Sequence, residues 1–338
     1  MIDDDLTIGL VGAGGIAHAH LPNLLRIAGR VVVFSEVGAD ELVALYGGEV
    51  VASLEELLEQ ADFVDVATPT YTHHAVVKRV IEAGKDVVSE KPLARTDDDA
   101  RDLVEAARGA GVQLYPAHVV RYFPEYAALK SAVDAGALGD LAVLRFSRSG
   151  AFPTRTPWFG DRALSGGIIM DQMIHDLDIA RWVAGEVVRV SAVSTRRGDA
   201  EHPVEAAHVL LTHASGAISH VAGIWGPAHL TFSTEYSVTG TLGTLSHSSL
   251  AERNYTADLE VTEAANGLMP EVDPREDPYY LELRSYASAF AGGETPRVSA
   301  EDGRIAVAIA NAALASLETG QPVDLAASST GSDEGVSR

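Results

Sequence analysis

The chain has 338 residues, of which 46% are hydrophobic, and it contains no cysteine. Disulfides, thiolate metal sites and cysteine nucleophiles are therefore excluded. Lysine and arginine total 25 against 48 aspartates and glutamates, which gives a formal net charge of −23. A surface this acidic repels nucleic acids and anionic membranes. We therefore expect a small-molecule partner, with no nucleic acid and no membrane among its partners.

The length of the chain and its first residues indicate how many domains to expect and where the protein is located. At roughly 150 residues per domain, the length predicts two domains. The opening stretch MIDDDLTIGL is acidic where a secretory signal is basic. No run approaches the roughly 18 apolar residues that span a membrane. These features predict a cytoplasmic protein.

From the start to about residue 118, short β-branched runs alternate with helical stretches. This alternation predicts an α/β domain, in which helices cover both faces of a parallel sheet. Ser53, before glutamates, is a predicted helix N-cap. The predicted strands are 6–12, 30–36, 61–70, 85–92 and 112–118, and the predicted helices are 16–29, 39–48, 53–60, 73–84 and 96–111.

After about residue 119 strands dominate, and several show the alternation of an antiparallel sheet with one wet face. Glycines in THASGAIS and TGTLGTL fall where hairpin turns are expected. We expect strands at 141–150, 187–197, 205–225 and 233–247, and helices at 124–135, 279–291 and 301–319. The natural division is 1–118, 119–325 and a small polar tail, 326–338, expected to be disordered.

The stretch GLVGAGGIAHAH carries the GxGxxA form of the dinucleotide fingerprint. Gly12 permits the tight turn, Gly14 lets the backbone approach a pyrophosphate, and Ala17 lets the helix pack closely on the strand. The helix that opens at Gly15 and Ile16 offers unpaired amides to the phosphates. Because the motif follows a strand and opens a helix, it predicts nucleotide binding.

The next acidic residue bears on the choice of nucleotide. A carboxylate is expected about 20 residues on, where it holds the adenosine ribose. Glu36 stands 19 residues after Ala17. A carboxylate there repels the extra phosphate of NADP, so NAD is the preferred cofactor. Ser35 could instead accept that phosphate, which leaves NADP as the alternative.

The tripeptide Glu90-Lys91-Pro92 stands at the carboxyl end of a predicted parallel strand, the edge where ligands bind in open sheets. A lysine there can hydrogen-bond a substrate hydroxyl or stabilise a developing alkoxide. The alternative interpretation is a surface lysine before a helix-starting proline.

The stretch LSGGIIMDQMIHDLD places Asp171 and His175 four residues apart, which puts them on one face of a helix. They can form a catalytic pair or an ordinary helix ion pair. A metal site with Asp176 and Asp178 is a third possibility. Neighbouring residues on a helix point in different directions, and no second histidine stands at zinc spacing, so we predict no metal.

These motifs, in this order, resemble the Gfo/Idh/MocA family of nicotinamide-dependent oxidoreductases, which act mainly on sugars, inositols and related polyols. The likeness extends over nearly the whole chain, as far as VSAEDGRIAVAIANAALASLETGQPV (298–323). It implies an N-terminal Rossmann domain and a C-terminal α+β domain with a large, mostly antiparallel open sheet. It also implies hydride transfer between nicotinamide and a secondary alcohol or ketone, and a homodimer or homotetramer, which light scattering would test.

The resemblance assigns cofactor contacts residue by residue. The glycine motif would hold the pyrophosphate. Thr68, Pro69 and His73 would line the path of the adenosine and nicotinamide ribose. Glu90 and Lys91 would lie at the nicotinamide, and the family commonly has a cis peptide bond after that lysine.

The family pattern GGxxxDxxxHD matches Gly166, Gly167, Asp171, His175 and the aspartate that follows. The resemblance therefore places Asp171 and His175 in the active site, facing the lysine. Histidine titrates near working pH and suits a general base. We hypothesise that His175 is the base, that the lysine polarises the reacting oxygen, and that Asp171 positions substrate and base.

Substrate contacts are predicted less directly. Arg121 keeps the family's ending of the stretch AHVVRYF, but Val119 and Val120 are apolar where relatives are polar. Arg121 either contacts substrate or braces the domain junction. Trp158 offers a flat face to a sugar ring or packs in the core. The remaining histidines considered, which we expect to be structural, are His74, His118, His208, His213 and His220.

Two other functions compete with a dehydrogenase. Some relatives retain the fold and cofactor but act as nucleotide-sensing regulators, and cofactor binding without turnover would show this. Others are glycosidases that use tightly held NAD for transient oxidation, which would release an aglycone without net NADH. The presence of the lysine, the aspartate and the histidine favours the dehydrogenase.

Overall fold

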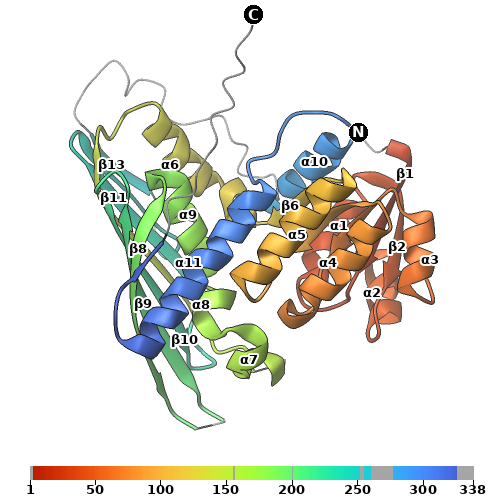
Figure 1. Ribbon diagram of the computed structural model, residues 1–338, viewed down its shortest axis with the longest axis horizontal. Coiled ribbons are helices and arrows are strands. Elements are labelled where there is room, and N and C mark those ends of the chain that lie inside the picture. The colour runs from red at the N-terminus through yellow and green to blue at the C-terminus, as the bar shows by residue number, and fades with distance from the viewer. Residues whose placement is uncertain (1–2, 155–156, 200, 252–254, 260–276, 326–338) are drawn as a thin grey trace, which may run out of the picture.

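The computed structural model describes residues 3–154, 157–199, 201–251, 255–259 and 277–325. Two sheets form separate layers, with helices packed between them (Figure 1). The predicted tail, 326–338, lies outside the described residues. Among the described residues, no helix combines the length and the apolar character needed to cross a bilayer.

The first sheet has six parallel strands in the order β3-β2-β1-β4-β5-β6. This is the strand order of the dinucleotide-binding doubly wound fold. Strands covered on both faces read as continuous apolar runs, and β4 is buried along its whole length. The strands are β1 (Asp3–Val11), β2 (Ala28–Phe34), β3 (Glu49–Val50), β4 (Phe63–Val66), β5 (Asp86–Glu90) and β6 (Leu114–Ala117).

Helices α1 to α5 connect these strands, and the structure ends the first helix earlier than predicted and adds one strand. The helix predicted over 16–29 ends at Leu24, because tight turns from Asn23 to Arg26 and from Leu24 to Ile27 carry the chain into β2. The two-residue strand β3 was not predicted. The helices are α1 (Ala17–Leu24), α2 (Ala39–Tyr46), α3 (Leu54–Gln60), α4 (His73–Glu82) and α5 (Asp97–Ala110).

Side-chain caps begin two of these helices. The Ser53 hydroxyl accepts the amide of Glu56 at 3.1 Å, which confirms the predicted N-cap. Thr96 accepts the amide of Asp99 at 3.1 Å in the same way. Each cap pairs an amide that the first helical turn leaves without a backbone partner, and typically stabilises the helix by about 1 kcal/mol.

The second sheet has eight strands in the order β13-β12-β11-β7-β10-β9-β8-β14, and all neighbours are antiparallel except β7 and β10. Burial alternates along β9 and β10, as expected for a sheet with one covered face. The predicted strands 205–225 and 233–247 are hairpins that turn at the expected glycines. The strands are β7 (Leu141–Ala151), β8 (Val187–Arg197), β9 (Val204–His213), β10 (Ile218–Gly226), β11 (Ser233–Gly240), β12 (Gly243–Ser248), β13 (Tyr255–Leu259) and β14 (Val323–Asp324).

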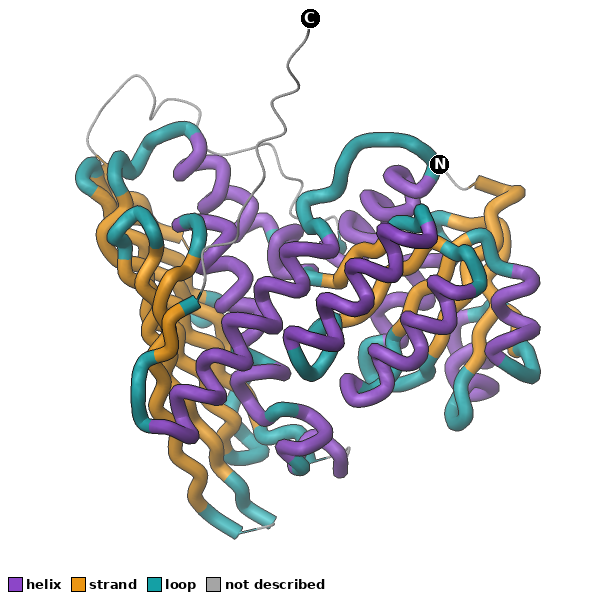
Figure 2. The backbone as a smooth tube through the Cα atoms, in the orientation of Figure 1, coloured by secondary structure: helices purple, strands orange, loops and turns teal. Residues whose placement is uncertain are grey.

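Helices cover only the face of this sheet that looks toward the first domain, as the tube view in Figure 2 makes plain. The opposite face carries no helix in the described residues. Three short 3-10 segments complete the fold, at Thr70–Thr72, Val119–Tyr122 and Pro157–Gly160. The helices are α6 (Pro124–Asp134), α7 (Arg162–Ser165), α8 (Gly167–Asp171), α9 (Ile174–Ala184), α10 (Pro278–Phe290) and α11 (Ala300–Thr319).

Helix α10 was expected to complete the second domain, but it packs on the first sheet. Leu283 and Tyr286 are buried with Ile8 and Leu10 of β1 in one apolar cluster. The Tyr286 ring stacks on Tyr115 of β6 with centroids 5.2 Å apart. Helical periodicity shows that one face of α10 is apolar, but it does not show which sheet that face covers.

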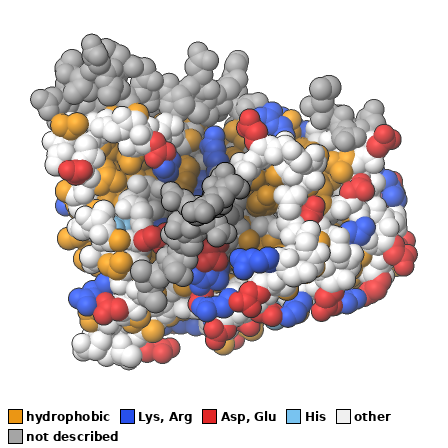
Figure 3. Space-filling view, turned by 45° about the horizontal axis from the view of Figure 1, so that its top comes forward, with side chains coloured by type: hydrophobic (Ala, Val, Ile, Leu, Met, Phe, Trp, Pro, Cys, Tyr) orange, Lys and Arg blue, Asp and Glu red, His pale blue; other side chains and the backbone are white. Residues whose placement is uncertain are grey.

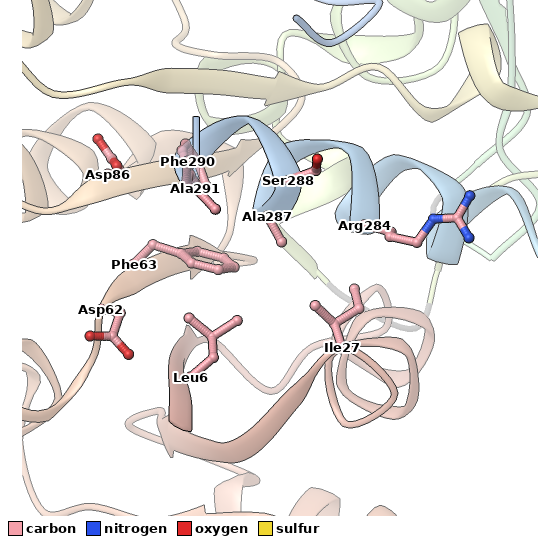
Figure 4. Close-up of a pocket in the computed structure, with 10 residues that line it drawn as sticks. All are labelled: Leu6, Ile27, Asp62, Phe63, Asp86, Arg284, Ala287, Ser288, Phe290 and Ala291. Atoms are coloured by element: carbon pink, nitrogen blue, oxygen red, sulfur yellow. The ribbon is translucent and has the colours of Figure 1, made fainter. Parts of the chain in front are cut away.

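A pocket opens between α10 and the first sheet (Figure 4). It lies at the amino ends of β1, β4 and β5, the edge opposite the glycine turn and Lys91. Its carboxylates serve the backbone, since Asp62 accepts the amide of Thr7 and Asp86 accepts the amide of Gln113. The pocket is therefore separate from the candidate site.

On the described part of the face in Figure 3, basic side chains are interspersed with acidic ones.

Candidate active site

The predicted cofactor residues gather along one edge of the first sheet. Gly12 follows β1, Glu36 follows β2, Thr68 follows β4 and Lys91 follows β5. Because parallel strands point the same way, these positions lie at the shared carboxyl edge, where open α/β sheets bind ligands. The structure therefore brings the glycine turn and Lys91 to one side of the molecule.

The glycine turn fits a dinucleotide. Gly12 has φ +112°, and a Cβ there would lie 2.4 Å from the carbonyl oxygen of Ala67, so only glycine is accommodated. Beside Gly14 and Gly15 the space is open, with no atom within 4 Å of an added Cβ. Among the described residues, the amides of Gly14, Gly15 and Ile16 donate to no backbone carbonyl. They stand at the N-terminus of α1, where amides bind anions.

The residues expected at the adenosine ribose follow β2. The Glu36 side chain is exposed, as a ribose contact requires. The Ser35 hydroxyl donates to the carbonyl of Val37 at 2.8 Å. This local hydrogen bond occupies the serine proton, which favours Glu36 over Ser35 as the residue that meets the nucleotide.

The predicted contact between His73 and the cofactor is not supported. His73 is 1% exposed, and its ring nitrogens lie 2.7 Å from the Pro92 carbonyl and 2.8 Å from the Thr68 carbonyl. Burial lowers its pKa. His73 thus ties the loop of Thr68 and Pro69, both half-buried, to the turn after β5. The Lys91–Pro92 peptide bond in that turn is cis, as predicted.

Lys91 and Asp171 meet across the two domains. The Lys91 ammonium donates to the Asp171 carbonyl at 2.7 Å and lies 3.3 Å from its Oδ1. Each side chain is 16% exposed, so the pair is largely shielded but still reached by solvent. An ammonium has three N–H groups, and these contacts use two. The third can meet a substrate oxygen.

The glycine pair at the start of α8 makes this contact between the domains possible. Gly166 and Gly167 have φ +80° and +68°, which favours glycine at both positions. A Cβ on Gly166 would lie 2.3 Å from an Arg95 Nη1 in the first domain, and one on Gly167 would lie 2.9 Å from Glu205 Oε1. The missing side chains allow α8 to pack against the first domain beside the active-site edge.

Asp171 and His175 do not share one regular helix, so that prediction is wrong. Asp171 ends α8, His175 lies in α9, and α9 begins at Ile174. The Gln172 side chain, in the break, donates to the carbonyl of Arg148 at 2.8 Å. No hydrogen bond joins Asp171 to His175 in the described structure, so Asp171 does not orient the imidazole. Its contact is Lys91 instead.

The His175 imidazole is half-buried, and its Nδ1 is buried with no hydrogen-bond partner among the described residues. Burial lowers the pKa of His175 well below its usual value, and the positive charges of Lys91 and Arg148 lower it further. The ring is therefore neutral at pH 7. A neutral imidazole can accept a proton from a hydroxyl.

The two aspartates after His175 are held by guanidinium groups. Asp176 pairs with Arg148 at 2.8 and 2.9 Å. Asp178 pairs with Arg121 at 2.8 and 2.6 Å. Within the described part of the chain, no group of three or more histidine, aspartate or glutamate side chains is arranged to hold a metal ion.

Arg121 is buried among protein partners that brace the fold. It is 1% exposed, and its guanidinium also donates to the Arg297 carbonyl at 2.6 Å and to Asp302 at 3.3 Å. These partners come from α9, from the segment before α11 and from the first turn of α11. Of the two roles left open by the sequence, the geometry supports the brace.

We expect Arg121→Met to lower the free energy of unfolding by about 3–5 kcal/mol, because it leaves the Asp178 carboxylate buried without its partner. Thermal unfolding measures the change. Arg189→Met is the control, since the Arg189–Asp324 pair is exposed and should contribute little. Equal stability of the two variants would contradict the assignment.

Trp158 remains a candidate for substrate contact. It is half-buried, stacks on Phe159 with ring centroids 3.9 Å apart, and meets Tyr71 of the first domain edge-on at 6.0 Å. It belongs to neither buried core cluster. The aromatic group therefore lies where the two domains meet, with part of the indole accessible.

The other histidines have structural contacts. Among them, His213 is buried between the Gly185 carbonyl and the Ser219 hydroxyl. The further pairs are His74 with Asp102 at 2.7 Å, His208 with His220 at 3.0 Å, and His118 with Asp178 at 3.7 Å.

Sequence reasoning missed a buried group beside Lys91, formed by His20, Asp65 and Glu90. Glu90 had been considered only as a cofactor contact. The available signal was an aspartate inside the apolar strand FVDV, together with a histidine one turn after the glycine motif.

Comparison with known proteins gives the family. The profile of the oxidoreductase family with an NAD-binding Rossmann fold matches residues 6–118. The profile of the GFO/IDH/MocA C-terminal domain matches residues 126–246. The chain belongs to the Gfo/Idh/MocA family of oxidoreductases, and the parallel sheet with its glycine turn is the family's NAD-binding domain.

Individual relatives are similar over nearly their whole length. Inositol 2-dehydrogenase 1 of Saccharopolyspora erythraea is 32% identical, over 94% of this chain and 96% of the relative. The 1,5-anhydro-D-fructose reductase of Ensifer adhaerens is 29% identical, over 94% and 98%. Among solved structures, GenD2 from gentamicin A biosynthesis in complex with NAD superposes with a TM-score of 0.79 at 26% identity, over 95% and 97%. The chain is a nicotinamide-dependent dehydrogenase or reductase.

Proposed function

We propose that this chain interconverts a secondary alcohol and a ketone on a sugar, an inositol or a related polyol, with NAD as the preferred cofactor. The observation that carries the proposal is the meeting of Lys91 with Asp171 near a neutral His175, at the sheet edge that holds the glycine turn. The names of the relatives, which act on inositol and on a sugar ketone, support this substrate class.

The residues assigned to the cofactor are those whose geometry fits it. The amides of Gly14, Gly15 and Ile16 would hold the pyrophosphate, and Glu36 would accept the hydroxyls of the adenosine ribose. Thr68 would line the remaining path with its neighbouring proline. When bound, NAD supplies the hydride acceptor.

The protein's own groups handle the proton and the oxygen. His175 takes the proton from the substrate hydroxyl as the C–H hydrogen departs with its electron pair, and returns it in the reverse reaction. The third N–H of Lys91 donates to the reacting oxygen and stabilises its developing negative charge. Asp171 holds the Lys91 ammonium in place through two of its N–H groups. The third N–H is therefore directed away from Asp171.

The test is nicotinamide absorbance with NAD and NADP in parallel, against inositols, aldoses and keto-sugars in both directions. We expect turnover with one polyol class and a preference for NAD. Cofactor binding without turnover on any member of the panel would contradict the dehydrogenase and favour a sensor. Release of an aglycone without net NADH would favour a redox glycosidase.

We also propose a homodimer or homotetramer, assembled through the uncovered face of the second sheet. Val193, Leu210, Ile218 and Ile224 lie on that face, at 65%, 49%, 44% and 38% exposure. Exposed aliphatic side chains gathered on a sheet face that no described helix covers are typical of an interaction surface. A monomer in light scattering would contradict the proposal.

A further inference from the structure

A buried charged group lies directly behind Lys91. His20 of α1 lies between Asp65 of β4 and Glu90 of β5. The His20 Nδ1 is 2.7 Å from Asp65 Oδ2, and its Nε2 is 3.2 Å from Glu90 Oε1. The exposures of these residues are 0%, 0% and 5%. Three elements of the NAD-binding domain thus meet in one water-poor contact.

The geometry sets the protonation of the histidine. A neutral imidazole has one N–H, so one ring lone pair would face a carboxylate across about 3 Å. The doubly protonated ring hydrogen-bonds Asp65 through Nδ1 and forms an ion pair with Glu90 through Nε2. Burial alone lowers the pKa of His20, but Asp65 and Glu90 outweigh burial and raise the pKa well above its usual value. His20 is therefore an imidazolium at neutral pH.

Two buried side chains of α10, Glu282 and Tyr286, lie near the charged group of His20, Asp65 and Glu90. Glu282 is fully buried, and burial together with the nearby Glu90 raises its pKa well above the usual value. The Tyr286 hydroxyl lies 2.9 Å from the Pro116 carbonyl and 3.1 Å from Glu282. The Tyr286 hydroxyl donates to the Pro116 carbonyl and to Glu282 Oε1, and the raised pKa of Glu282 favours its neutral form. Glu282 then adds no second negative charge beside Glu90.

The charged group connects to the candidate reaction centre through Glu90. The second carboxylate oxygen of Glu90 accepts the backbone N–H of Lys91 at 3.0 Å. The Lys91 ammonium donates a hydrogen bond to the Asp171 carbonyl of the second domain. A continuous set of contacts therefore runs from α1, which opens at the glycine turn, to the ammonium assigned to the reacting oxygen.

We propose that His20 is a positioning residue: it holds the Glu90 carboxylate against the backbone of Lys91 and so fixes the lysine for reaction. The expected effect of His20 on the reaction rate rests on the proposed function. The charge state of His20 does not depend on that function. The other titratable groups around it are His73 of α4, which borders Glu90, and Tyr279 of α10, whose ring centroid is 5.9 Å from that of His20.

The first test needs no substrate. In protein labelled with ¹⁵N-histidine, the His20 resonance is assigned by its loss in His20→Gln. We expect it to report an imidazolium at neutral pH, and to titrate at a lower pH in Glu90→Gln. A neutral His20 at pH 7 in the wild type would overturn the proposal, whether or not a substrate has been found.

The second test uses the substrate found in the polyol panel. We expect His20→Gln to lower kcat about 10–100-fold, with Kd for NAD within threefold of wild type. The acid limb of the pH–rate profile should move upward, because Glu90 loses its counterion. A folded His20→Gln variant with unchanged kcat and profile would overturn the proposal.

A double variant separates positioning from general destabilisation. If His20 acts through Glu90, His20→Gln with Glu90→Gln should be no slower than Glu90→Gln alone, whereas independent effects multiply. His213→Gln is the matched control, a buried histidine of the second domain that is 1% exposed. It should leave the pH profile unchanged. Multiplicative losses in the double variant would overturn the proposal.

Discussion

Replacing Lys91 with methionine should lower kcat by about 10²–10³-fold, the usual effect of removing one donor from a developing oxyanion. Methionine retains much of the aliphatic stem but cannot donate to the reacting oxygen. It also removes the charge that pairs with Asp171 at 3.3 Å. We expect Kd for NAD to change less than threefold, because the glycine turn is untouched. Stopped-flow absorbance and NAD titration measure the two quantities.

Lys85, at the other end of the same strand, provides the control. Lys85 lies immediately before β5, and Lys91 lies immediately after it. The Lys85 ammonium donates to the Ala61 carbonyl at 2.8 Å. Both lysines thus bind a backbone oxygen, but at opposite edges of the sheet. Lys85→Met should leave kcat within about twofold. Comparable losses in the two variants would show that the effect of Lys91 is structural.

Replacing His175 with alanine should lower kcat/KM by about 10²–10⁴-fold, as expected when a general base is removed. The wild-type acid limb should lie below pH 6.5, because burial lowers the pKa of His175 and keeps the ring neutral. The variant should lose that limb. Initial rates between pH 5 and 9 check both expectations, with His74→Ala as the control, since the His74 side chain contacts Asp102 of α5.

The same pKa shift has a consequence for stability. The unfolded chain protonates its histidines near pH 6.5, whereas folded His175 does so only at lower pH. As pH falls through 6.5, the unfolded state therefore binds the extra proton and the folded state loses stability. His175→Ala should reduce this loss of stability.

A His175→Ala variant that retains most of its kcat/KM would contradict the assignment of His175 as the general base.

Lys91→Met and His175→Ala also test each other. The ammonium of Lys91 is one of the charges that lower the pKa of His175, after burial. In Lys91→Met the residual activity should therefore show an acid limb at higher pH than in the wild type. The shift should be partial, since burial of the imidazole remains.

The local devices of the NAD-binding domain were open to prediction because they act over a few residues. Gly12 must adopt φ +112°, and Ser53 must cap the helix that follows it, whatever the rest of the chain does. The resemblance to the family correctly predicted the cis bond at Lys91–Pro92. The alternation of strands and helices predicted a parallel sheet with helices on both faces, but neither β3 nor the order of the strands.

The roles inside the site were predicted less well, for a physical reason. Spacing predicts that Asp171 and His175 share one face of a helix, yet a break between two short helices directs Asp171 to Lys91. Likewise, the sequence leaves two roles open for Arg121, and its buried partners support the brace. A side chain's role depends on which partners the fold brings within about 3 Å, and those partners lie 57 or more residues away.

The sequence by itself determined the glycine turn, the alternation that makes a parallel sheet, and the residue types available for proton and hydride chemistry. Only the tertiary structure decided that α10 covers the first sheet and that His20 lies between Asp65 and Glu90. Periodicity specifies which face of an element is apolar, whereas the pairing of buried charges depends on three-dimensional packing. Desolvation makes an unpaired buried charge costly, so packing fixes which charges must meet.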